Sequence, residues 1–113
     1  MRDSDNMLAL LESMMPEPAD EVARKIADDF RKRRIEKGLT REAVAAKSGV
    51  ALSNIARFEQ KGLISLTNLI ELAIALGYNL EIKSIFSEPK YSSMEELLQI
   101  RKNTGKKKAH TPK

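Results

Sequence analysis

Hydrophobic residues recur every three or four positions up to about residue 76, which predicts a mainly helical chain. Residues 6–15 are expected to form a helical arm, which two prolines end. Residues 20–37 predict an amphipathic helix, closed by Gly38 in the left-handed conformation that favours glycine. The expected buried stripe of this helix is spaced by four residues: Val22, Ile26, Phe30 and Arg34.

Three further helices are predicted, with glycines at the breaks between them. The first covers 41–47 behind the N-cap residue Thr40, and the second covers 52–60. The third covers 66–76 behind the N-cap residue Ser65. The apolar side chains expected on the inner faces of these helices are Val44, Ala45, Ile55, Phe58, Leu66, Leu69, Ile70, Leu72, Ala73 and Leu76.

The pattern changes after residue 78. Residues 79–83 alternate polar with apolar side chains, the period of a half-buried β-strand, and we extend this predicted strand to residue 86. A single strand in a helical chain needs partners for its backbone groups, so we expect it to pair with a second copy; the alternative is a loop. The predicted dimer interface consists of Leu80, Ile82, Ile85 and Phe86.

A last helix is predicted from the capping-box spacing of Ser93 and Glu96 to about residue 102. Beyond it the chain is rich in lysine and is expected to be disordered. The sequence therefore divides into an acidic arm at 1–18, a helical domain at 19–78, a dimerisation strand with a C-terminal helix at 79–102, and a basic tail at 103–113.

The charge is distributed unevenly within a total of +4. One Arg and six acidic residues give a net charge of −5 at 1–23, whereas thirteen basic and ten acidic residues give +3 at 24–98. Six basic residues and no acid give +6 at 99–113. A basic middle and tail favour a polyanionic partner, with nucleic acid first among the candidates.

Catalytic chemistry finds little support in the composition. The chain has no Cys, and its one His, His110, lies in the polar tail, so thiolate metal sites and histidine-based catalysis are not expected. We find no carboxylate pair or phosphate-cradling glycine loop, and we predict no enzyme, cofactor or metal. No secretory signal or membrane-spanning run is visible, so a cytoplasmic protein without membrane association is expected.

The central signal is a pair of short helices, 41–47 and 52–60, joined by a tight turn that contains Gly49. This arrangement is typical of a helix-turn-helix, in which the second helix enters the major groove of DNA. Ile55 and Phe58 would anchor the second helix to the core. The residues that then remain outside are Leu52, Ser53, Asn54 and Arg57.

Between positions 30 and 78, helix, turn and core residues occur at intervals that are specific when taken together, although no single one of them is. These residues are Phe30, Arg34, Gly38, Leu39, Thr40, Val44, Ala45, Gly49, Val50, Ile55, Phe58, Glu59, Ser65, Leu66, Ala75, Leu76, Gly77 and Tyr78. On these residues the segment resembles the Cro and phage-repressor (XRE) helix-turn-helix family. The resemblance implies a mainly α fold, a five-helix-type lambda-repressor-like domain, here followed by the predicted strand. Two residues depart from the family pattern: Arg41 stands where many members carry Gln, and Ala51 stands at the usual cap.

The resemblance also implies roles for residues that match the family's positions. Base contacts are expected from Leu52, Ser53 and Arg57. Contacts to the DNA backbone are expected from Arg41, Asn54, Lys61 and Asn68. Arg34 and Glu59 match positions that pair in some members, so we expect an internal ion pair.

Function is accordingly predicted as sequence-specific binding of double-stranded DNA by a homodimer that represses a palindromic operator. The segment after residue 78 looks like that of HipB-type antitoxins, which implies a HipA-like kinase toxin or another toxin as partner. The acidic arm is then a candidate toxin contact, unless Leu8 and Leu11 pack on the domain. Two alternatives stay open: a nonspecific nucleic-acid-binding protein that uses the lysines at 106–108, and an interaction module without DNA binding.

Overall fold

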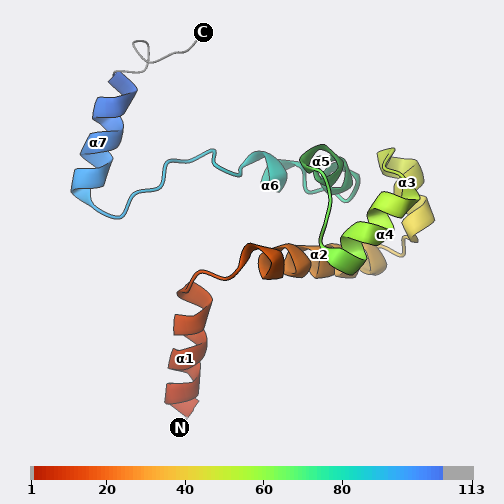
Figure 1. Cartoon of the computed structure of the whole chain (residues 1–113), viewed down its shortest axis with the longest axis horizontal. Coiled ribbons are helices and arrows are strands. Elements are labelled where there is room, and N and C mark those ends of the chain that lie inside the picture. Colours follow the sequence, from red (N-terminus) through yellow and green to blue (C-terminus); the bar gives the residue numbers. More distant parts are fainter. Residues whose placement is uncertain (1, 106–113) are drawn as a thin grey trace. The chain divides into compact units, whose positions relative to one another are not determined.

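The computed structural model describes residues 2–105, and this part of the chain is mainly helical, as predicted. It divides into two compact units, one ending at Ile82 and the other beginning at Lys83. Figure 1 shows the helices in chain order. They are α1 (Arg2–Met14), α2 (Ala19–Glu36), α3 (Arg41–Ser48), α4 (Leu52–Lys61), α5 (Leu66–Ala75), α6 (Asn79–Lys83) and α7 (Met94–Gly105).

The core of the first unit is built by α2, α3, α4 and α5. Helix α4 packs against α2, and α3 packs against both α4 and α5. The rings of Phe30 and Phe58 meet at a centroid distance of 5.4 Å and an interplanar angle of 55°, which joins α2 to α4. The buried apolar cluster consists of Ala27, Phe30, Val44, Val50, Ile55, Phe58, Leu72 and Leu76.

The predicted stripe on α2 is only half right. Phe30 and Arg34 are buried, but Val22 and Ile26 are exposed, and Ala27 takes the inward position instead. Residues spaced strictly by four drift about 40° per step around a helix with 3.6 residues per turn. A spacing that alternates between three and four stays on one face, which is why Ala27, Phe30 and Arg34 line the core together.

The helix boundaries follow the predicted caps. Thr40 Oγ1 accepts a hydrogen bond from Ala43 N at 3.0 Å, and Ser65 Oγ accepts one from Asn68 N at 3.1 Å. Ala51 offers no side-chain acceptor to α4, as its methyl group requires. These bonds fix where α3 and α5 begin.

The predicted strand at 79–86 is wrong. Residues 79–83 form helix α6, whose Ile82 N donates to Tyr78 O at 3.0 Å, and no strand occurs anywhere in residues 2–105. A strand in one chain would leave its backbone groups without partners, whereas a helical turn satisfies them locally. The predicted interface residues therefore lie on or just after a short helix; Leu80, Ile85 and Phe86 are exposed, and Ile82 is half-buried.

Helix α7 opens with the predicted N-cap, because Glu96 N donates to Ser93 Oγ at 3.1 Å. The Glu96 carboxylate accepts from Ser92 N at 2.6 Å, one residue before the position that a capping box uses. The helix continues through 103–105, which the sequence had assigned to a disordered tail. The rest of that tail, with its lysines at 106–108 and His110, lies outside the described residues.

The helical arm predicted at 6–15 is present as α1, which begins at Arg2. Leu8 and Leu11 are both exposed, so the alternative in which they pack on the domain is not seen. None of the helices in the described chain combines the length and apolar character that a membrane crossing requires.

We expect Gly62→Ala to destabilise the domain more than Gly38→Ala. Both glycines have φ +72°, so each substitution costs about 1–2 kcal/mol in the left-handed region. A Cβ at Gly62 would also lie 3.1 Å from the backbone of Ala23 and Arg24, whereas a Cβ at Gly38 would meet nothing within 4 Å. Crowding should add about 1 kcal/mol or more at Gly62. Urea denaturation of both variants measures the difference, and equal losses would contradict a close approach of α2 to the end of α4.

Candidate nucleic-acid interface

The turn between α3 and α4 is tight and well bonded. Gly49 has φ +79°, and its N–H donates to Ala45 O at 2.9 Å, which ends α3. Ser48 Oγ accepts a hydrogen bond from Val50 N at 3.1 Å, and the Val50 side chain is buried. The turn therefore fixes the angle at which α4 leaves α3.

Helix α4 has an inner and an outer face. Ile55 and Phe58 are fully buried on the inner face, as the sequence predicts. Leu52, Ser53 and Arg57 are exposed, and Arg57 follows Ser53 by four residues, which places the two on one side of the helix. Within the described residues no hydrogen bond or ion pair engages the Arg57 side chain. The outer face of α4 thus offers the hydroxyl of Ser53 and the cation of Arg57 to a ligand, and Leu52 is exposed at the first turn of the helix.

The residues expected at the DNA backbone lie on three helices. Asn54 and Lys61 are exposed on α4, at its first and last turns. Asn68 is half-buried in the first turn of α5. Arg41 is the first residue of α3, and its side chain is 33% exposed. The structure thus leaves each of these side chains at least partly accessible, while their contacts with DNA stay predictions.

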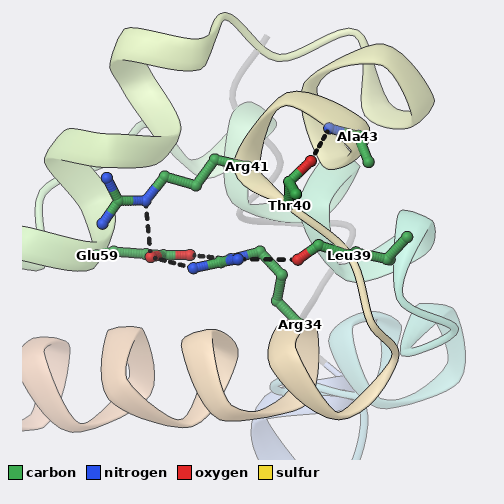
Figure 2. Close-up of polar contacts among 6 residues, drawn as sticks. All are labelled: Arg34, Leu39, Thr40, Arg41, Ala43 and Glu59. Atoms are coloured by element: carbon green, nitrogen blue, oxygen red, sulfur yellow. Dashed lines mark hydrogen bonds and ion pairs between the residues drawn. The ribbon is translucent and has the colours of Figure 1, made fainter.

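The expected ion pair between Arg34 and Glu59 is present (Figure 2). Arg34 Nε donates to Glu59 Oε2 at 2.7 Å, and Arg34 Nη2 donates to Glu59 Oε1 at 2.9 Å. Arg34 Nη1 donates to Leu39 O at 2.9 Å. This bidentate pair is nearly buried, with side chains 10% and 1% exposed, and it ties α4 to the end of α2.

Sequence reasoning missed a second cation on the same carboxylate. Arg41 Nε donates to Glu59 Oε1 at 3.0 Å. The only hint in the sequence was that Arg41 stands where many family members carry Gln, and that hint does not by itself identify Glu59 as the partner. The site therefore contains two guanidinium groups and one carboxylate, drawn from α2, α3 and α4.

Glu59 and Arg34 influence each other's protonation. Burial acts to raise the pKa of Glu59, but hydrogen bonds from Arg34 and Arg41, together with their charges, bring that pKa below its usual value. The hydrogen bond to Glu59 raises the pKa of Arg34 against the opposing effect of burial. Both groups are therefore charged at neutral pH, and the charge of Glu42 also acts on Arg34.

In a helix-turn-helix domain, a tight turn joins two short helices, and the core anchors the second helix so that its outer face stays exposed. Helices α3 and α4 have this arrangement. Residues 30–83, slightly less than half of the chain, match the helix-turn-helix family model, so this segment is a helix-turn-helix domain of the Cro and phage-repressor (XRE) type. The resemblance predicted over 30–78 is thereby confirmed. No curated protein matches the chain. Domains of this type are DNA-binding and regulatory, not catalytic, so the protein is a DNA-binding transcription regulator.

Proposed function

We propose that this regulator is a dimeric repressor that recognises a palindromic operator with α4 in the major groove. The observation that carries the proposal is the outer face of α4, where Ser53 and Arg57 are exposed opposite the buried Ile55 and Phe58, with Leu52 exposed at the first turn of the helix. A helix anchored on one side and polar on the other fits a groove about 12 Å wide.

The outer face suggests a division of roles. Arg57 can place its planar fork on guanine, and Ser53 can bond to either type of base, whereas Leu52 fits the methyl group of thymine. The side chains at the margins of the motif suit phosphate and sugar contacts that set the register: Arg41, Asn54, Lys61 and Asn68.

Selection of binding sites from a randomised duplex pool tests the proposal. A repressor should enrich a palindrome with half-sites about 10 base pairs apart and bind it roughly 10³-fold or more tightly than random duplex. A protein that coats nucleic acid without specificity would enrich no sequence and would bind both duplexes alike. A module without DNA function would bind neither duplex at low salt.

We propose that two copies of the chain meet through apolar side chains at and after α6, and that no pairing of β-strands is involved. Phe86 is 98% exposed at φ +65°, and Ile85 next to it in the chain is exposed too, which leaves apolar side chains uncovered at the start of the second unit; Leu80 is exposed on α6 in the first unit. Such surfaces in soluble proteins commonly mark contacts with other chains. A second copy would cover this surface and supply the second reading helix of a palindrome.

We expect Phe86→Asp to shift the protein from dimer to monomer in sedimentation velocity, because a charge would enter the apolar contact. Tyr91→Asp is the matched control, since Tyr91 is exposed but lies outside the proposed interface. The control should stay dimeric. A dimeric Phe86→Asp variant would contradict this interface, and a monomeric parent protein would contradict the dimer itself.

The narrower antitoxin role is proposed for the same protein. Helix α1 exposes Leu8 and Leu11, and residues 1–23 have a net charge of −5, which disfavours DNA and suits a basic surface of a protein partner. The neighbouring reading frame tests the role. A kinase-like toxin that binds the full chain but not a chain lacking residues 1–18 would support it, and a lone gene would favour an ordinary regulator.

A further inference from the structure

We propose that Glu59 is a positioning residue for a phosphate contact made by Arg41. The inference rests on the proposed DNA-binding role of the helix-turn-helix and adds a role for a side chain that would not itself touch DNA. Glu59 lies on α4, behind the reading face, while Arg41 begins α3. The carboxylate thus connects the helix that would read bases to the arginine that would hold the backbone.

Arg34 and Arg41 differ in how many of their guanidinium nitrogens remain free to donate hydrogen bonds to a ligand. Arg34 is saturated, because its three guanidinium nitrogens donate to Glu59 and to Leu39 O. Arg41 uses only Nε on Glu59, and no other hydrogen bond engages its side chain among the described residues. In Figure 2 the two terminal nitrogens of Arg41 point away from Arg34 and Leu39. Arg41 therefore retains the donors of a bidentate fork.

Charge directs that fork toward an anion. Two guanidinium groups share the one carboxylate that bonds to them, and Arg41 is the more exposed of the two; Glu42 adds a negative charge that acts on Arg34 without a hydrogen bond to it. A phosphate oxygen pair matches the spacing of the two terminal N–H groups. Because Glu59 already restrains the side chain through Nε, binding loses less rotamer freedom than it would with a free arginine.

This arrangement requires arginine and not merely a positive charge. A lysine has one ammonium group, which cannot bond to Glu59 and grip a phosphate from the opposite side with fixed geometry. Arg41→Lys should therefore weaken operator binding about tenfold although the charge is kept. Lys32→Arg is the matched control, because Lys32 is an exposed lysine on α2 that belongs to none of the proposed DNA contacts; it should change affinity less than about twofold.

The coupling is measured in a double-mutant cycle with operator duplex and full-length protein. Arg41→Ala should weaken binding and lower the salt slope by about one unit. Glu59→Gln and Arg41→Ala together should weaken binding about fivefold less than the product of the single effects. Glu59→Gln and Lys61→Ala should combine additively, because that pair has no shared contact. Circular dichroism confirms that each variant is folded.

An additive result for Glu59→Gln with Arg41→Ala would overturn the inference, and so would full operator affinity in Arg41→Lys. If Glu59→Gln does not fold, the comparison of Arg41→Lys with Lys32→Arg decides, because neither substitution removes the buried carboxylate. A parent protein that binds no duplex DNA would overturn the proposed function itself, whereas binding with an unchanged salt slope in Arg41→Ala would overturn only the phosphate contact.

Discussion

Glu59→Ala should lower the free energy of unfolding at pH 7 by about 3–5 kcal/mol, as much as the loss of a large core side chain. Its loss would leave the Arg34 guanidinium, 10% exposed, without its carboxylate partner, and would free Arg41 as well. Removing one member of a buried pair costs more than the pair's net contribution, because the remaining charge stays out of water. Urea denaturation followed by circular dichroism measures the change.

Asp29→Ala is the matched control for this prediction. Asp29 accepts a hydrogen bond from Lys25 at 2.9 Å, but both side chains are exposed. An exposed pair one helical turn apart contributes little, so the control should unfold close to the parent protein. Similar losses in the two variants would show that the Glu59 site is not held as tightly as its geometry indicates.

The contribution of Glu59 should depend on pH in a defined direction. The pKa of its carboxyl is lowered by the two arginines, although burial opposes the shift, so the unfolded chain binds the proton more readily than the folded one. The stabilisation is therefore complete above the ordinary Glu pKa of 4.5 and is lost as the pH falls through the lower value of the folded state. The difference between the parent protein and Glu59→Ala should shrink below about pH 4.5; a constant difference would contradict the assignment.

The helices of the domain could be predicted because their signals are local. Thr40 and Ser65 carry the oxygen atoms that cap α3 and α5, and Gly49 and Gly62 adopt positive φ where helices end. Ile55 and Phe58 are three residues apart, a spacing that defines one helix face. Each of these properties belongs to a few neighbouring residues.

Features that depend on distant residues were predicted less well. The alternation at 79–83 is compatible with a strand only if another strand lies beside it, and the chain forms α6 instead. The bond from Arg41 to Glu59 depends on how α3 meets α4, which no spacing within either helix reveals. The inward position of Ala27 is a different case, because the alternating three-and-four spacing of one face of α2 gives it locally and the strict spacing by four missed it.

Arg57→Ala should weaken operator binding about 10- to 100-fold, which corresponds to roughly 1–3 kcal/mol for a bidentate contact with guanine. The side chain is exposed on α4 and no hydrogen bond of the described chain holds it, so its removal should leave the fold intact. Competition binding with operator duplex and random duplex at one salt concentration measures both affinities. The loss on random duplex should be only severalfold, because there the arginine contributes charge alone.

Arg24→Ala separates base reading from charge, because Arg24 is an exposed arginine on α2 outside the proposed interface. It removes the same charge and should change both affinities by similar small factors. If Arg57→Ala instead weakens operator and random duplex equally, Arg57 holds only the backbone, and base reading must come from Leu52 and Ser53 alone. A hydroxyl and an apolar side chain discriminate bases less than an arginine fork does, so the preference for the operator would then have to come largely from the shape of the DNA.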